Sequence, residues 1–270
     1  MITYRHLKAA IFDWAGTVID HGSLAPMGAF VKAFAEFGVD ISIEEARGPM
    51  GMAKRPHIAA LMALPRIAEA WQASRGRLPE DRDIDAVFEI FLPMNIAAAK
   101  EHSRLIAGAA RTIAKLREGG LKIGSTTGYT HEIMDAILPL AAEQGFAPDS
   151  LVCTGDTPAG RPSPFMIYRS LMDMGVWPAS HCIKVDDTEI GIAEGLNAGA
   201  WTVGVVMSGN VFGLSETETS RLPAAELASR RESGYARMRS CGAHHVIDSI
   251  ADLEPVAVEI EGRLQRGERP

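Results

Sequence analysis

Short apolar runs recur along the chain, and each is followed by a stretch of helical character. The runs are KAAIFD (8–13), LKIGSTT (121–127), LVCT (151–154), CIKVDD (182–187), AWTVGVV (200–206) and HHVIDS (244–249). Short, continuously apolar strands that alternate with helices are typical of a parallel sheet covered on both faces. The sequence therefore predicts an α/β fold built on a doubly wound parallel sheet.

One long interval breaks this alternation. Between the first two predicted strands, residues 22–105 are mostly helical in character and are divided by prolines. A crossover between parallel strands needs only about a dozen residues or somewhat more, so this interval is too long to be a simple connection. We predict an inserted helical cap domain over 22–105 and a catalytic core formed by 1–21 and 106–270. The hinges between the cap and the core are expected near 22–26 and 103–108.

The composition limits the kinds of partner and the cellular compartments that we expect for this protein. The formal net charge of −7 argues against a surface for polyanions, so we expect no nucleic-acid partner. No run approaches the roughly 18 apolar residues of a membrane span, and no N-terminal stretch has the form of a signal peptide. The three cysteines show no paired spacing, which fits a reducing compartment. We therefore expect a cytoplasmic protein with no membrane partner.

Polar residues stand where the predicted strands end, and open α/β sheets bind ligands at that edge. Asp13 ends the first strand, residues 125–127 end the second, and Asp186 and Asp187 end the fourth. Hydroxyl and backbone N–H groups at a helix N-terminus can hold a phosphate, and a guanidinium such as Arg161 can neutralise it. Adjacent carboxylates suit Mg²⁺, which also takes waters and phosphate oxygens.

Each of these residues has a simpler interpretation when it is taken alone. Asp13, the hydroxyl residues and one of the paired acids could be helix N-caps. Arg161 could be exposed to solvent, although it lies in a loop between a glycine and a proline. The order of the whole set, each member at a strand end, favours an anion-binding, metal-assisted site.

The same motifs resemble those of the haloacid dehalogenase superfamily. FDWAGT (12–17) is similar to its first motif, STT (125–127) to its second, Arg161 to its basic third, and VDDTEIGIAEGLNAG (185–199) to its fourth. The resemblance spans most of the chain. It implies a Rossmann-like core in which Asp13 is the nucleophile, and a cap inserted where residues 22–105 lie.

A narrower resemblance is to the phosphonoacetaldehyde hydrolase (phosphonatase) family. It rests on FDWAGT together with PMGMAK (49–54), GSTTGYT (124–130) and PAGRPSPFM (158–166). That family has alanine at the position of the second acid, a cap lysine after PMG, and arginine in the third motif. Here these are Ala15, Lys54 and Arg161. Members differ in the arrangement of the fourth-motif acids, and this chain has an adjacent pair with Gly191 farther along.

The family resemblance implies a small phosphonate substrate, phosphonoacetaldehyde, cleaved to acetaldehyde and phosphate in 2-aminoethylphosphonate degradation. Lys54 would form a Schiff base with the aldehyde, so that the protonated imine accepts the electrons of the C–P bond. Asp13 would attack phosphorus and form an aspartyl phosphate. A homodimer is also implied by the resemblance.

The remaining roles follow from the same resemblance. Mg²⁺ would be held by Asp13, Asp187 and the carbonyl of Ala15, with Asp186 supporting. The residues implied for the substrate and its phosphate are Thr126, Arg161, Gly128, Tyr129, Met50 and His57. Without the resemblance, Lys54 would be interpreted as a solvated surface lysine. His57 shares a helical face with Lys54, and it is either a proton carrier for imine formation or a structural histidine.

Four other functions remain to be weighed. A superfamily phosphatase acting on a small phosphate ester, or a sugar-phosphate mutase, usually needs an acid two residues after the nucleophile, where this chain has Ala15. A haloalkanoic acid dehalogenase would not need Mg²⁺, so the acid pair counts against it. A non-catalytic binding module would not need the whole set of motif residues. Residues 213–240 predict two polar helices, to which the sequence assigns no role.

Overall fold

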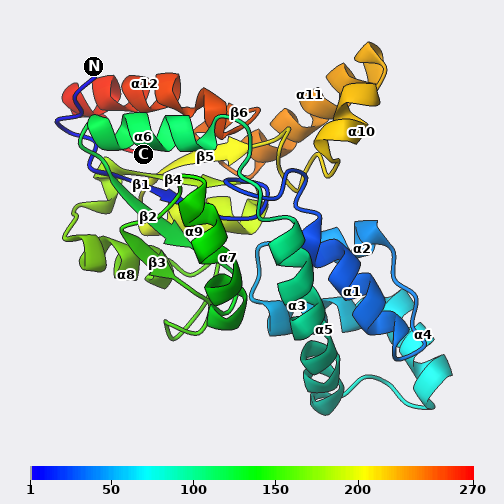
Figure 1. Ribbon diagram of the computed structural model, residues 1–270. Helices are drawn as coiled ribbons and strands as arrows, with labels where there is room; N and C mark the ends of the chain where they lie inside the picture. The colour runs from blue at the N-terminus through cyan, green and yellow to red at the C-terminus, as the bar shows by residue number, and fades with distance from the viewer. Residues whose placement is uncertain (1) are drawn as a thin grey trace.

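The computed structural model describes residues 2–270 and contains a six-stranded, fully parallel sheet (Figure 1). Its strands are β1 (Ala9–Phe12), β2 (Lys122–Thr126), β3 (Ser150–Val152), β4 (Cys182–Asp186), β5 (Trp201–Val205) and β6 (His245–Ile247). The spatial order is β3-β2-β1-β4-β5-β6. All six predicted strands are present, and the predicted doubly wound α/β class is confirmed. Because the order reverses beside β1, the carboxyl ends of β1, β2 and β4 form the expected ligand-binding edge.

Helices cover both faces of this sheet. Alternate residues of β1 point to opposite sides, so Ala10 and Phe12 join one apolar cluster while Ala9 and Ile11 join another. The helices that pack in the first cluster are α6 (Ala109–Glu118), α7 (His131–Glu143) and α12 (Leu253–Gln265). The helices on the other face are α8 (Phe165–Met174) and α9 (Glu189–Ala198). Burial on both faces explains why the strands are continuously apolar in the sequence.

Five helices between β1 and β2 form a separate body beside the sheet, at the lower right of Figure 1. They are α1 (Ala25–Ala35), α2 (Ile43–Arg47), α3 (Lys54–Met62), α4 (Pro65–Arg75) and α5 (Asp81–Glu101). They pack around their own apolar cluster, in which Phe30 stacks on Phe91 at 4.2 Å between ring centroids. The apolar residues of α1 and α3 are therefore used inside this body.

Two antiparallel connecting segments join the five helices to the sheet. Ile19 forms a β-bridge with Leu105, and the N–H of Ile106 donates to the carbonyl of Val18 at 2.8 Å. Asp20 lies at the same junction, where its carboxylate accepts from the N–H groups of Leu24 and Ala25 at the start of α1, at 3.0 and 2.9 Å. The aspartate thus satisfies N–H groups that have no partner within the helix.

The segment 213–240 forms the two polar helices that the sequence predicts, α10 (Glu216–Arg221) and α11 (Ala224–Ser240). Met238 of α11 packs on Gly204 of β5, where a Cβ would lie 3.0 Å from the methionine side chain. The remaining short helices are η1 (Ala179–His181) and η2 (Ile250–Asp252). Within residues 2–270, no helix combines the length and the apolar character that a membrane crossing requires.

Candidate active site

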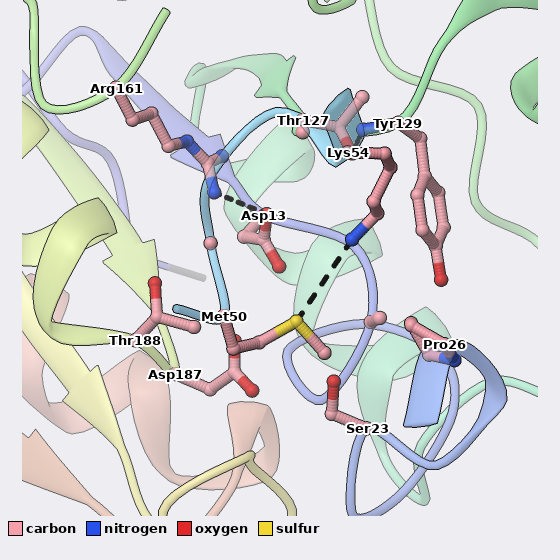
Figure 2. Close-up of a pocket in the computed structure, with 13 residues that line it drawn as sticks. Asp13, Ser23, Pro26, Met50, Lys54, Thr127, Tyr129, Arg161, Asp187 and Thr188 are labelled. Atoms are coloured by element: carbon pink, nitrogen blue, oxygen red, sulfur yellow. Dashed lines mark hydrogen bonds and ion pairs between the residues drawn. The ribbon is translucent and has the colours of Figure 1, made fainter. Parts of the chain in front are cut away.

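A small cavity lies at the carboxyl ends of β1, β2 and β4, where the cap helices meet the sheet (Figure 2). Its volume is about 20 Å³. Most of the predicted site residues line it, namely Asp13, Ala15, Met50, Lys54, Gly128, Tyr129, Arg161 and Asp187. Residues that are far apart in the sequence are therefore brought to one place. Three predicted residues, Thr126, His57 and Asp186, do not line the cavity.

Asp13 is the first residue beyond β1, and its N–H donates to Val185 of β4 at 3.0 Å. Its carboxylate lies 2.8 Å from Nη1 of Arg161 (Figure 2). Burial raises the pKa of Asp13 to about 6, and the charge of Asp186 adds to the rise, whereas Arg161 and Lys184 oppose it. The carboxylate is therefore mainly ionised at neutral pH.

The turn after β1 allows a second carboxylate to approach. Gly16 has a positive φ of 81°, and a Cβ on it would lie 2.1 Å from Oδ2 of Asp187. Asp187 accepts from the N–H of Asn210 at 2.7 Å. Burial raises the pKa of Asp187 well above its usual range, and the charges of Asp13 and Asp186 raise it further.

One oxygen from each of Asp13, Asp186 and Asp187 can be chosen so that all three lie within 4.8 Å of one another. Buried carboxylates at such a separation repel one another, and a divalent cation between them would relieve the repulsion. Oxygen donors are those that Mg²⁺ prefers. The donor set therefore fits the predicted cofactor.

Asp186 itself lies behind the cavity wall. Its Oδ1 accepts from the N–H and the hydroxyl of Thr188 at 3.0 and 2.7 Å. A Cβ on Gly191 would lie 1.9 Å from Cγ of Asp186, so the carboxylate fills the place where a side chain at position 191 would begin. The carboxylate of Asp186, at the end of β4, thus occupies the space beside the first turn of α9.

A buried charge network fixes the guanidinium of Arg161. Its Nε lies 2.9 Å from Glu194 and its Nη1 lies 3.3 Å from Asp186. Lys184 joins the same network, with its Nζ 3.0 Å from Asp186 and 3.2 Å from Glu194. Only 1% of the Arg161 side chain is exposed. The network aims the guanidinium at Asp13, and simple solvent exposure of this arginine is ruled out.

Lys184 and Glu194 belong to this network, although no sequence motif indicated them as site residues. Both are fully buried. A lysine inside an otherwise apolar strand, CIKVDD, was the available signal, because a buried charge needs a partner of opposite sign.

The structure corrects the predicted phosphate ligand at the end of β2. The hydroxyl of Thr126 faces the buried network, where it accepts from Lys184 at 2.8 Å and donates to Glu194 at 3.0 Å. Thr127 lines the cavity instead. Neighbouring residues of a strand point to opposite sides. A prediction that is wrong by one position therefore names a residue that faces the buried network in place of the one that lines the cavity.

Lys54 begins α3, and its side chain enters the cavity (Figure 2). Its Nζ lies 4.0 Å from Sδ of Met50 and 5.0 Å from the centroid of the Tyr129 ring. Burial lowers the pKa of Lys54 to about 8, Asp13 opposes the shift, and Arg161 adds to it. With 3% of its surface exposed, Lys54 is not a solvated surface lysine.

Close packing between cap and core explains this burial. We call residues 49–52 the cap loop. A Cβ on Gly51 would lie 2.5 Å from Oγ1 of Thr188, and a Cβ on Gly128 would lie 2.7 Å from the carbonyl oxygen of Met52. Glycine at both positions allows the cap loop to contact the loops that follow β2 and β4, and so shields Lys54 from water.

The structure also corrects the prediction for His57. Its Nε2 lies 2.8 Å from the carbonyl oxygen of Ala46, its ring packs 4.1 Å from that of Phe30, and it lies outside the cavity lining. Burial lowers the pKa of His57 to about 3, and the charge of Lys54 lowers it further. This placement favours the structural interpretation of His57 over that of a proton carrier.

Comparisons with known proteins agree with these motifs. Residues 7–199 match the haloacid dehalogenase-like hydrolase family. The chain is 61% identical to a phosphonoacetaldehyde hydrolase of Paraburkholderia xenovorans (strain LB400) and 47% identical to one of Klebsiella pneumoniae, each across 98% of this chain and 100% of the relative.

A crystal structure of a phosphonoacetaldehyde hydrolase like protein from Oleispira antarctica superposes with a TM-score of 0.97 at 41% identity. The match covers 100% of this chain and 98% of that one. Both levels of the predicted resemblance are therefore confirmed. The chain is an enzyme that belongs to the phosphonoacetaldehyde hydrolase family, within the haloacid dehalogenase-like hydrolases.

Proposed function

We propose that the protein cleaves the C–P bond of phosphonoacetaldehyde to acetaldehyde and phosphate, in the degradation of 2-aminoethylphosphonate. Its relatives carry the name of that activity. The observation that carries the proposal is the buried amine of Lys54, whose pKa is lowered to about 8, facing the same cavity as Asp13 and Arg161. An amine in this state suits the aldehyde of the substrate, and the carboxylate and guanidinium suit its phosphonate.

Cleavage of a C–P bond needs a place for the electrons of the departing carbon, because that carbon is a poor leaving group. The neutral amine of Lys54 attacks the aldehyde carbon, and loss of water gives an imine. Once protonated, the imine nitrogen withdraws electrons from the adjacent carbon. An acid at position 15 would have no oxygen leaving group to protonate, which accounts for Ala15.

Asp13 then attacks phosphorus. The electrons of the C–P bond move into the protonated imine and give an enamine on Lys54, while the phosphoryl group is transferred to Asp13. Arg161 and the N–H groups near Thr127 and Gly128 would hold the phosphoryl oxygens. Water hydrolyses the aspartyl phosphate. The enamine takes up a proton, and hydrolysis of the resulting imine releases acetaldehyde and restores Lys54.

In this proposal Asp13, Asp187 and the carbonyl of Ala15 would hold Mg²⁺, and Asp186 would support them through the network around Arg161. When bound, Mg²⁺ would supply positive charge that stabilises the charge on the phosphoryl oxygens. The close approach of the three carboxylates supports this assignment.

We further propose that residues 22–105 act as a cap domain that moves relative to the core, 1–21 and 106–270. A cavity of about 20 Å³ holds little more than one water molecule, so the substrate needs the cap loop to move before it can enter. The paired segments around Ile19 and Leu105 are the connections about which such a movement would occur. Closure would then exclude water and bring Lys54 to the aldehyde.

A direct comparison of substrates tests the proposed reaction. The purified enzyme is given phosphonoacetaldehyde or glycolaldehyde phosphate, a small phosphate ester that carries the same aldehyde, with Mg²⁺ present. We expect phosphate and acetaldehyde in equal amounts from the phosphonate, with a kcat/KM far above that for the ester. An equal or higher kcat/KM for the ester would favour the alternative, a phosphatase acting on small esters.

The lowered pKa of Lys54 predicts a distinctive pH dependence of imine formation. The folded enzyme is treated with acetaldehyde and a reductant, and ethylation is measured by peptide mass spectrometry at Lys54 and at the exposed Lys32. Because the neutral amine reacts, ethylation of Lys54 should rise about tenfold per pH unit and level off above pH 8. The ratio of the two signals cancels the pH dependence of the reductant. A rise at Lys54 that continues in parallel with Lys32 beyond pH 9 would contradict the lowered pKa.

We also propose that the enzyme forms a homodimer. The apolar residues of cap helices α1 and α3 are buried within the cap, but α8 and the loop that follows it expose an apolar stripe. Its members are Phe165, Tyr168, Met172 and Trp177, with Met172 71% and Trp177 82% exposed. Large exposed apolar patches commonly mark contact surfaces.

The Met172→Glu variant should therefore reduce the molar mass measured by light scattering from that of a dimer to that of a monomer. Leu78→Glu, which changes an exposed leucine on the cap, serves as the matched control and should leave the mass unchanged. A wild-type monomer would contradict the proposal.

The three unpaired cysteines support a reducing compartment, and we place the enzyme in the cytoplasm on that ground.

A further inference from the structure

A second group of potential metal ligands lies on the core, outside the lining of the catalytic cavity. It consists of His131 at the start of α7, Cys153 directly after β3, and Asp156 in the following loop. One ligand atom from each residue can be chosen so that all three lie within 4.8 Å of one another. Neither the fold nor the proposed reaction accounts for this combination of nitrogen, sulfur and oxygen.

The carboxylate of Asp156 is held in a fixed orientation. Its Oδ2 accepts from the N–H of Cys153 at 2.8 Å, and its Oδ1 lies 2.7 Å from Nε2 of His131. A backbone donor on one oxygen leaves the other to face the ring nitrogen. Such outer hydrogen bonds orient ligands in metal sites and reduce the reorganisation that binding requires.

The charges around the group favour a cation. The carboxylates of Asp156, Asp135 and Glu132 lie close enough to act on both the Cys153 thiol and the His131 imidazole. The negative charges of these three acids therefore favour a cation at this place.

We propose that His131, Cys153 and Asp156 form a binding site for a transition-metal dication of the Zn²⁺ type. Imidazole, thiolate and carboxylate are the three zinc ligands of proteins, and their bond lengths of about 2.0–2.3 Å place tetrahedral ligand atoms roughly 3.3–3.7 Å apart. The 2.7 Å contact between Nε2 of His131 and Oδ1 of Asp156 must lengthen by up to about 1 Å, and the other separations, which are at most 4.8 Å, must shorten by up to about 1.5 Å. The metal inserts between the imidazole nitrogen and the carboxylate, and the thiol loses its proton to solvent as the metal–sulfur bond forms.

The position of the site gives it a structural consequence. The side chain of His131 is 58% exposed, which leaves the fourth coordination position open to water. The N–H of Thr154, next to Cys153, donates to the carbonyl of Tyr129 in the cavity wall at 3.1 Å. A bound metal would therefore join the loops after β2 and β3, and stabilise the segment that presents Tyr129 to Lys54.

Cobalt supplies a direct spectroscopic test on the full-length enzyme. Metal-free protein is titrated with Co²⁺, and the charge-transfer absorption of a cobalt–thiolate bond is recorded. The catalytic carboxylates contain no sulfur, so binding there gives no such band. We expect one saturable band at a stoichiometry of one, and its loss when Zn²⁺ is added, because Zn²⁺ displaces Co²⁺.

Variants separate this site from other thiols. Cys153→Ser should abolish the band, and His131→Ala, a change at an exposed side chain, should weaken Co²⁺ binding at least tenfold. Cys241→Ser, which removes the half-buried cysteine after α11, should leave the band intact. The proposal is overturned if excess Co²⁺ gives no thiolate band, or if the band survives in Cys153→Ser. Should that variant fail to fold, unchanged affinity in His131→Ala overturns it as well.

Discussion

In the Lys54→Ala variant we expect turnover of phosphonoacetaldehyde to fall by at least about 10⁴-fold, a loss of the size seen when a covalent catalyst is removed from an enzyme. Without the amine there is no imine, and the electrons of the C–P bond have no acceptor. Lys54→Arg should be equally inactive, because it keeps the positive charge but cannot form the imine. Initial rates of phosphate and acetaldehyde release measure both effects.

A matched control separates this chemistry from damage to the cap. Lys32→Ala removes an exposed lysine from α1 and should keep full activity. In wild-type enzyme, borohydride added during turnover should stop activity and leave a two-carbon adduct on Lys54. Full activity of Lys54→Ala would sink the Schiff-base proposal while leaving the family membership untouched.

The Asp13→Asn variant should block phosphate release as completely, but at a later step. Asparagine has nearly the same shape as aspartate and is a poor nucleophile, so phosphorus is not attacked. Imine formation on Lys54 does not need Asp13. Borohydride should therefore trap an adduct that still contains phosphorus, heavier than the wild-type adduct by the phosphono group.

The adduct mass thus reports whether the C–P bond broke before reduction. Asp40→Asn, which changes an exposed acid on the cap, should give the wild-type adduct. A phosphorus-free adduct in Asp13→Asn would show that the bond breaks without this nucleophile. Absence of any adduct would show instead that Asp13 is needed to seat the substrate, which the proposed order of steps does not allow.

Sequence patterns located the strands well, because burial on both faces makes each strand a continuous apolar run. They located Asp13 and Asp187 for a similar reason, since polar residues directly after such runs meet at one edge of the sheet. Arg161 lies in the loop between β3 and α8, and its motif indicated it. They did not distinguish Thr126 from Thr127. At a strand end, the direction of a side chain depends on the residue at which the extended backbone changes into a turn. Neighbouring elements determine which residue that is.

Burial was the property that the sequence concealed most fully. Lys54 is an ordinary lysine at the start of a helix until the cap loop packs over it, and that packing depends on Gly51 and Gly128 in separate segments. His57 shares a helical face with Lys54 as expected, but its partner is a carbonyl of α2. Long-range contacts of this kind have no local signal in the chain.

The contact between Asp186 and Gly191 has a consequence for the evolution of this family. While Asp186 is present, any side chain at position 191 would overlap its carboxylate, and while residue 191 is glycine, that space receives an acid only from position 186. The two positions are therefore epistatic. To move the acid from position 186 to position 191, a lineage must change both codons. If position 191 changes first, the two side chains collide, and if position 186 changes first, the site has no acid at this place.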